Sequence, residues 1–195
     1  MWVKICGMTT PAAVAAALEA GADAIGFVFA ESVRRVTPRR AHELATAARG
    51  RVPLVAVIRH ATQQEFDLIL ADFAPDVLQA ELADLARLAL PRELGVLTVV
   101  RAGREPPDPP PRRVLFEGPV SGTGVPCDWT RARAFAQKTE LVLAGGLNAR
   151  NVAAAIGAVR PFGVDVSSGV EEKPGIKSAL EIARFVAAAR QESQA

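Results

Sequence analysis

A repeated alternation of short and longer apolar patterns is the feature that most constrains the fold of this chain. A short apolar run is followed by an amphipathic run at intervals of roughly 20 to 25 residues, which is typical of βα units. The short runs are continuous and mostly apolar, as parallel strands buried on both faces should be. They lie at Val3–Cys6, Ala24–Phe29, Leu54–Ile58, Val77–Gln79, Val96–Val100, Val114–Phe116, Leu141–Ala144 and Phe162–Val166.

The longer runs carry helix-start signals. Thr10-Pro11 and Thr37-Pro38 are typical of an N-cap followed by proline at the first helical position. Thr62 with Glu65 forms a capping box, and Ser178 with Glu181 begins the last helix. The expected core-facing residues are Val14, Ala17, Leu18, Ala41, Leu44, Ala45, Ala48, Phe66, Ile69, Leu70, Phe73, Leu82, Leu85, Ala86, Ala89, Val152, Ala155, Ile156, Val159, Ile182, Phe185, Val186 and Ala189.

One segment, Gly103 to Arg113, breaks this rhythm. Its sequence EPPDPPPRR cannot form a helix interior, because proline lacks the amide proton and clashes with the preceding turn. We therefore expect an extended Pro-rich loop in place of the helix after the fifth strand. Eight strands and seven helices then predict an α/β fold of the (β/α)8 TIM-barrel type, formed as a single domain over residues 1–195. A doubly wound open sheet has the same alternation and stays open as an alternative.

The stretch Leu141–Glu171 reads as strand, glycine loop, helix, strand and glycine loop. The first loop contains Gly145-Gly146 and the second Ser167-Ser168-Gly169. Glycine lets backbone N–H groups approach a ligand closely, and such groups at a helix start form a site for a dianion. Two such loops late in the chain match the phosphate site after strands 7 and 8 of a (β/α)8 barrel. Tight strand-to-helix turns without a ligand would also explain these glycines.

Composition excludes several classes of protein. The net charge of +2, with arginines spread along the chain, does not indicate nucleic acid or a membrane as partner. The chain opens directly into a strand-like run rather than a signal peptide, and no apolar run approaches the length of a membrane span. Two cysteines do not make a disulfide scaffold. We therefore expect a cytoplasmic protein.

Two residues lie where a barrel places its chemistry, at the ends of strands and the start of the following loops. Cys6 ends the first strand, so it is either a small buried apolar side chain or a thiol at the barrel mouth that acts as nucleophile or base. Asp128 begins the helix after the sixth strand. Aspartate there serves well as an N-cap, which favours an ionised carboxylate and conflicts with a role as general acid. Nothing specific supports a role for Cys127.

Other polar residues are weaker candidates. Arg34 and Arg35 lie in the loop after the second strand, where they are either solvated or bind an anionic substrate. Asp165 lies inside the eighth strand, where a charge is costly unless it is paired or faces the mouth. Gln79 and Glu81 alternate on one face of the fourth strand and could both point into the barrel. His42 and His60 are expected at the surface, and neither a metal-ligand spacing nor a dinucleotide fingerprint is present.

Taken together, several motifs resemble the phosphoribosylanthranilate isomerase family of tryptophan biosynthesis over nearly the whole chain. They are KICGMT, GFVF followed by SVRRVTP, CDW, LAGGLNARNV and VDVSSGVE, in that order. The resemblance implies a (β/α)8 enzyme that performs an Amadori rearrangement of N-(5-phosphoribosyl)anthranilate to the 1-deoxyribulose phosphate.

The resemblance also implies roles for individual residues. Cys6 matches the general base that removes the C2′ proton, and Asp128 the general acid that protonates the ring oxygen. The family's Ser-x-Arg pattern favours Arg34 over Arg35, so Arg34 looks like the residue that binds the anthranilate carboxylate. Asp165 looks like a residue that contacts the ribose. The implied phosphate site consists of Gly145, Gly146, Ser168 and Gly169. No cofactor is implied, because the iminium formed on ring opening is itself the electron sink.

The chain departs from the family at two strand ends. Relatives commonly read QLHG at the end of the fourth strand, where this chain has Glu81 and Leu82, and LD at the end of the sixth, where it has Phe116-Glu117. An inward-facing Glu81 near the anthranilate carboxylate would be unfavourable unless it pointed away.

Two alternatives stay open on sequence alone. The histidine-pathway isomerase needs a second phosphate loop in the first half of the barrel, and CGMTTP and RHATQQ lack a glycine pair. A non-catalytic barrel that binds a sugar phosphate would have no use for a thiol at Cys6 with a carboxylate at Asp128. The oligomeric state is not specified, and a homodimer is one option.

Overall fold

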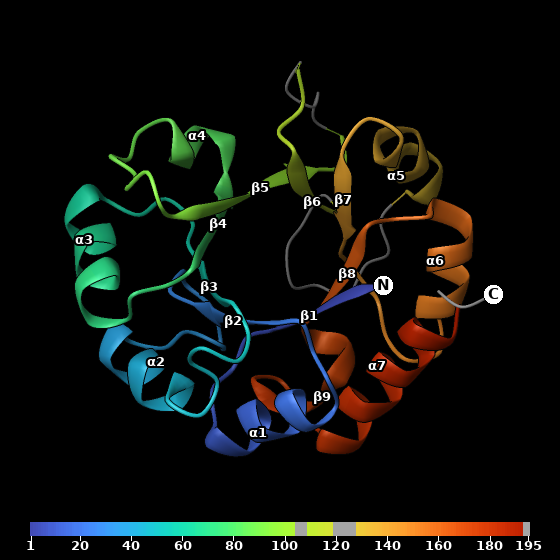
Figure 1. Cartoon of the computed structure of the whole chain (residues 1–195), viewed down its shortest axis with the longest axis horizontal. Helices are drawn as coiled ribbons and strands as arrows, with labels where there is room; N and C mark the ends of the chain where they lie inside the picture. The colour runs from blue at the N-terminus through green and yellow to red at the C-terminus, as the bar shows by residue number, and fades with distance from the viewer. Residues whose placement is uncertain (104–108, 119–127, 193–195) are drawn as a thin grey trace.

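The eight predicted strands form a closed barrel surrounded by helices (Figure 1). This computed structural model describes residues 1–103, 109–118 and 128–192. The strands are β1 (Trp2–Cys6), β2 (Ala24–Val28), β3 (Leu54–Val57), β4 (Val77–Glu81), β5 (Gly95–Arg101), β6 (Arg113–Glu117), β7 (Glu140–Leu143) and β8 (Gly163–Val166). All neighbouring pairs are parallel, and β1 pairs with β8 in the register Lys4 to Asp165. This closure excludes the open doubly wound sheet.

The helices cover the outside of the barrel (Figure 1). They are α1 (Pro11–Glu19), α2 (Pro38–Ala45), α3 (Gln63–Asp72), α4 (Leu82–Leu85), α5 (Trp129–Ala136), α6 (Val152–Val159) and α7 (Ala179–Glu192). After β8 come a 3₁₀ turn, η1 (Ser168–Val170), and a small antiparallel pair, β9 (Glu171–Lys173) and β10 (Ile176–Lys177).

The predicted helix starts are confirmed by their hydrogen bonds. The side chains of Thr10 and Thr37 accept from Ala13 N and Arg40 N, and proline follows each of them. Thr62 and Glu65 form the complete capping box of α3. Each of these caps satisfies amide donors that have no partner inside the helix.

The fourth helix is much shorter than its apolar pattern predicts. Leu82, expected in the core, is 49% exposed, and α4 ends at Leu85. Pro91 follows soon after, and the residue before a proline disfavours helical backbone. The loop that replaces the rest of this helix is held by Ala89 N, which donates to Gln63 Oε1 at 2.8 Å.

The Pro-rich loop lies partly outside the described residues. Neither 102–103 nor 109–112, the described parts of the link between β5 and β6, contains a helix. Residues 104–108 are not described, so the replacement of a helix by this loop stays a prediction.

The core has two layers. Most buried apolar side chains pack between the barrel and its helices, while Leu97, Leu115, Val142 and Ala144 fill the inside of the barrel. Alternation along each strand therefore decides which side chains enter the barrel. The carboxyl ends of the strands, where barrels build their active sites, carry the polar residues described below.

Candidate functional site

Cys6 lies at the mouth of the barrel, as the last residue of β1. It is 6% exposed, and its Sγ lies 2.8 Å from the position that a Cβ on Gly26 would occupy. The Nζ of Lys4 lies 3.2 Å from the same point. Glycine on β2 therefore leaves the space in which the thiol of Cys6 and the ammonium of Lys4 come together.

Lys4 is fully buried and forms an ion pair inside the barrel. Its Nζ donates to Asp165 Oδ1 at 2.8 Å, across the junction between the first and last strands. Asp165 is only 8% exposed, so this pair provides the partner that a charge within a strand requires. Burial lowers the pKa of Lys4, but Asp165 and Cys6 outweigh it and raise the pKa above its ordinary value.

The same surroundings act on the thiol. Burial raises the pKa of Cys6 above its ordinary value, and the negative charge of Asp165 adds to this effect. The charges of Lys4 and Lys177, together with a hydrogen bond from Lys4, act in the opposite direction. Burial thus disfavours the thiolate form of Cys6, and the neighbouring cations favour it.

A second cluster of charges lies beside Cys6, where β8 continues into β9 and β10. Arg34 forms two hydrogen bonds to Glu171, with Nε–Oε1 at 2.6 Å and Nη2–Oε2 at 2.8 Å. Lys177 donates to Glu171 Oε1 at 2.9 Å and to Ser167 O at 2.9 Å. Ser167 Oγ donates in turn to the carbonyl oxygen of Cys6 at 3.0 Å.

The pKa values within this cluster follow from its pairing. Burial raises the pKa of Glu171, but hydrogen bonds from Arg34 and Lys177 outweigh it and leave the pKa below the ordinary value. The hydrogen bond to Glu171 raises the pKa of Arg34. Burial lowers the pKa of Lys177, and Glu171 offsets only part of that shift.

The two glycine loops predicted to bind phosphate lie against each other. Gly145 and Gly146 have φ angles of 91° and 67°, a conformation that favours glycine. A Cβ on Gly169 would stand 1.8 Å from the carbonyl oxygen of Leu147, so only glycine permits this contact between the loops. Ser168 begins the 3₁₀ turn η1 directly after β8.

Asp128 caps α5. Its Oδ1 accepts from Thr130 N at 2.9 Å and from Arg131 N at 3.2 Å, and the side chain is exposed. The prediction of an N-cap is therefore confirmed, whereas its role as general acid stays a prediction. Cys127 lies outside the described residues.

The two departures from the family pattern are joined by one arginine. Arg101, at the end of β5, donates from Nε to Glu81 Oε1 at 2.8 Å and approaches Glu117 Oε1 with Nη1, also at 2.8 Å. Leu78 and Ala80 pack toward the helices, so the alternate residues Gln79 and Glu81 face the interior, as predicted. Glu81 is thus inward-facing but paired.

Gln79 carries an orphaned acceptor. It is 6% exposed, and within the described part of the chain its Oε1 is one of the buried side-chain atoms that have no hydrogen-bond partner. A buried amide oxygen without a partner is costly unless a ligand or water supplies the donor. Gln79 therefore joins the candidates for contact with a bound substrate.

Sequence reasoning missed Lys4, Glu171 and Lys177. Lys4 could have been found from the strand period, because it lies two residues before Cys6 and must share its face. Glu171 and Lys177 gave no such signal, since their pairing depends on the fold of the β9–β10 turn. His42 and His60 are both exposed, as expected.

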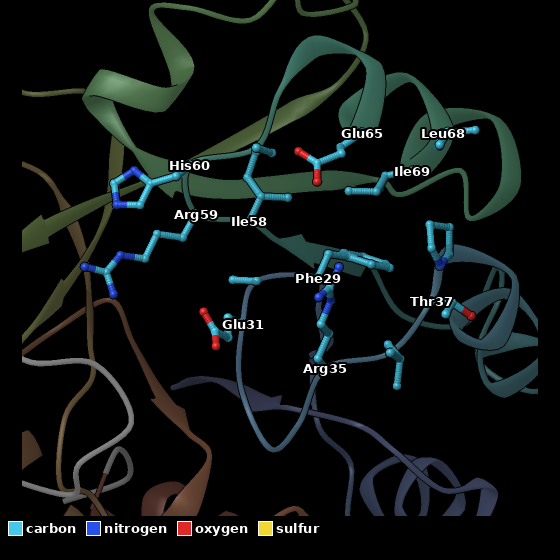
Figure 2. Close-up of a pocket in the computed structure, with 14 residues that line it drawn as sticks. Phe29, Glu31, Arg35, Thr37, Ile58, Arg59, His60, Glu65, Leu68 and Ile69 are labelled. Carbon is cyan, nitrogen blue, oxygen red and sulfur yellow. The ribbon is translucent and has the colours of Figure 1, made fainter.

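A separate cavity of about 590 Å³ opens outside the barrel interior, between the loop after β2 and helix α3 (Figure 2). Phe29, Ile58 and Ile69 form its apolar wall, and Arg35 and Arg59 border it. Neither Cys6 nor Asp165 lines this cavity. This cavity is therefore separate from the thiol of Cys6.

The described part of the chain contains neither a metal-ligand cluster nor a helix that could span a membrane. Residues 1–103, 109–118 and 128–192 contain no cluster of three or more His, Cys, Asp or Glu side chains able to hold a metal ion. Across those same ranges, no helix has both the length and the apolar character needed to cross a membrane.

Comparison with known proteins gives a consistent result. Residues 3–188 match the family model described as N-(5′-phosphoribosyl)anthranilate (PRA) isomerase. The N-(5′-phosphoribosyl)anthranilate isomerase of Listeria monocytogenes serotype 4b is 38% identical over 200 residues, which cover 97% of this chain and 98% of that protein.

Solved structures agree with the sequence match. The phosphoribosyl anthranilate isomerase of Thermus thermophilus superposes with a TM-score of 0.84 at 29% identity, over 98% of this chain and 99% of that one. A phosphoribosyl anthranilate isomerase in complex with reduced 1-(o-carboxyphenylamino)-1-deoxyribulose 5-phosphate superposes with a TM-score of 0.77 at 29% identity, with the same coverage. Another match, at a TM-score of 0.77 and 28% identity over 98% of this chain and 99% of that one, is a monomer generated from the dimeric enzyme of Thermotoga maritima.

Proposed function

The chain belongs to the N-(5′-phosphoribosyl)anthranilate isomerase family, and from this premise we propose which of its residues carry the reaction. It is an enzyme of tryptophan biosynthesis that isomerises N-(5′-phosphoribosyl)anthranilate. The observation that supports the residue roles best is the buried thiol of Cys6 at the barrel mouth, next to the ion pair of Lys4 and Asp165.

In the proposed first step, Asp128 donates a proton to the ring oxygen of the ribose. The bond between C1′ and this oxygen breaks, and the lone pair of the anthranilate nitrogen forms the C1′ iminium. Both cap bonds go to Oδ1, so Oδ2 is the oxygen proposed to carry this proton while the cap stays in place. Proton transfer by a positioned side chain contributes on the order of 10²–10⁴ in rate.

In the proposed second step, the thiolate of Cys6 removes the proton from C2′. The electron pair of that bond moves to form C1′=C2′ and neutralises the iminium nitrogen. The resulting enaminol becomes the product when C1′ gains a proton and the C2′ hydroxyl loses one. Atoms and charge balance over the two steps, so the residues need no redox partner.

Two groups of residues are proposed to bind the two anionic ends of the substrate. The loops of Gly145, Gly146, Ser168 and Gly169 are proposed to hold the phosphate with backbone N–H groups. Arg34 is proposed to bind the anthranilate carboxylate: a guanidinium has five N–H donors, and two of them serve Glu171. Asp165, and Gln79 with its orphaned oxygen, are proposed to contact ribose hydroxyls.

Three broader features complete the proposal. We expect the chain to act as a single domain in the cytosol, with the Pro-rich segment standing in place of a helix. A homodimer is proposed on the precedent of the dimeric Thermotoga maritima relative. Sedimentation velocity at several protein concentrations tests it, and a monomer at all of them would contradict it.

The roles of Cys6 and Asp128 are tested by steady-state kinetics on freshly generated phosphoribosylanthranilate. We expect Cys6→Ser and Asp128→Asn each to lower kcat by about a hundredfold or more, as the loss of a general base or acid does. Wild-type turnover in either variant would show that the substituted residue does not have its proposed catalytic role. An inactive wild type that still binds a product analogue would instead support the non-catalytic alternative.

A further inference from the structure

The surroundings of Cys6 contain a charge, the ammonium of Lys4, that has no role in the two proposed steps. Lys4 is fully buried, and its Nζ and the Cys6 Sγ converge on one point above Gly26. A buried ammonium is costly, and the single carboxylate of Asp165 would suffice to compensate it. Placing this ammonium beside the thiol as well is unnecessary for a purely structural ion pair.

The charges around Cys6 do not balance. Lys4 on β1, Lys177 on β10 and Arg34 in the loop after β2 are cations, whereas Asp165 on β8 and Glu171 on β9 are carboxylates. Three cations against two carboxylates leave one positive charge in a nearly buried space. A thiolate at Cys6 would complete the balance.

Building on the proposed function, we propose that Lys4 is a positioning residue that stabilises the thiolate of Cys6. Asp165 holds the ammonium in place through its bond to Nζ, and Gly26 keeps the space between ammonium and thiol open. Lys4 itself exchanges no proton with the substrate. Its fixed charge makes the base available in an interior that otherwise favours the neutral thiol.

The charges predict opposite effects for the two members of the ion pair. Removing the ammonium leaves burial and Asp165 unopposed at close range, so the thiol should hold its proton to higher pH. Asp165→Asn keeps an oxygen that can accept from Lys4 Nζ but takes away a negative charge that disfavours the thiolate, so the thiol should lose its proton at lower pH. A purely structural role for the pair would not produce shifts of opposite sign.

The thiolate can be titrated directly in this chain. The sequence contains no tyrosine, so no phenolate overlaps the ultraviolet absorbance of a thiolate, and its cysteines are two in number. In a Cys127→Ser background Cys6 is the only thiol, and subtracting the same titration of Cys6→Ser isolates its signal. This measurement needs no turnover.

We expect Lys4→Met to raise the titration midpoint of Cys6 by about one pH unit or more, a roughly tenfold loss of thiolate below the midpoint. Asp165→Asn should lower the midpoint. Arg113→Met is the matched control, because it removes an equal charge that is paired with Glu140 at the opposite end of the strands. Its midpoint should equal that of the wild type.

An unchanged midpoint in Lys4→Met, or shifts of the same sign in the two variants, would overturn the proposal. If far-UV circular dichroism shows Lys4→Met to be unfolded, the downward shift in Asp165→Asn and a wild-type midpoint in Lys4→Arg decide the question. In Lys4→Met the acidic limb of the pH profile of kcat/KM should move to higher pH, in parallel with the titration midpoint. Activity retained by Cys6→Ser would overturn the function of the thiol while leaving the midpoint test of Lys4 intact.

Discussion

At the scale of single residues, Gly169 shows how the two proposed phosphate loops depend on each other. The chain at Gly169 passes so close to Leu147 that a Cβ would stand 1.8 Å from its carbonyl oxygen. That oxygen belongs to the backbone and cannot rotate away as a side chain would. The separation of the loops is therefore set by the absence of a side chain at this position.

We expect Gly169→Ala to lower the free energy of unfolding by about 1–3 kcal/mol or more, as overpacking does, and to raise the KM for substrate. Gly50→Ala is the control: its φ is +74° and no atom would meet its Cβ, so it costs only backbone strain of about 1–2 kcal/mol. Urea denaturation and initial rates measure both effects. A wild-type KM in Gly169→Ala would show that this contact between the loops does not contribute to phosphate binding.

Residue positions in the site were predictable only where a local pattern marked them. Cys6 and Asp165 stood out because one ends a strand and the other places a charge inside a strand. Lys4 was not singled out, although it lies inside the first predicted strand and, like Asp165, places a charge there. The pairing of Arg34 with Glu171 spans 137 residues, and no local pattern encodes such a contact.

At the scale of elements, the N-caps made the starts of several helices predictable. Threonine followed by proline marks where α1 and α2 begin, because side-chain oxygen and fixed φ both act locally. The end of α4 was predicted incorrectly, since apolar spacing continued through Ala89 while the chain turned before Pro91. Helix ends set by tertiary contacts are less visible in sequence than helix starts set by caps.

The cap of α5 allows the structural and catalytic roles of Asp128 to be separated. Asparagine caps a helix about as well as aspartate, so Asp128→Asn should leave the free energy of unfolding within a few tenths of a kcal/mol of the wild type. Asp128→Ala should lower it by about 1 kcal/mol, similar to Thr62→Ala at the capping box of α3. Both Asp128 variants should be equally inactive. Equal stability of Asp128→Ala and the wild type in urea would contradict the cap.

At the scale of the whole molecule, charged contacts join the two ends of the chain. Lys4 and Asp165 link the first and last strands, and Arg190 of α7 bonds Asp23 Oδ2 at 2.7 Å and also the carbonyl oxygen of Met1. Arg34 and Glu171 join the loop after β2 to the β9–β10 turn. The Lys4–Asp165 pair therefore belongs both to the closure of the barrel and to its mouth. Sequence periodicity predicted the strands, but this closure depends on contacts between residues far apart in the chain.

Glu171 makes this coupling measurable as a dependence of stability on pH. Burial raises its pKa, but bonds from Arg34 and Lys177 leave the pKa below the ordinary 4.5, so the folded state binds this proton more weakly than the unfolded chain. Its contribution to stability is therefore fully present above about pH 4.5 and is lost as pH falls through the folded-state pKa. Glu171→Gln should be less stable than the wild type at neutral pH, and the difference should shrink on acidification.

The measurement is urea denaturation of both proteins at fixed salt over a series of pH values from neutral into the acid range. Glu43→Gln is the control, because it removes a carboxylate from an exposed pair with Arg40 on α2, where ion pairs contribute little. The free energies of unfolding of the wild type and of Glu43→Gln should depend on pH in nearly the same way. A difference between wild type and Glu171→Gln that stays constant with pH would mean that the Arg34–Glu171–Lys177 cluster stabilises the fold by packing rather than by charge.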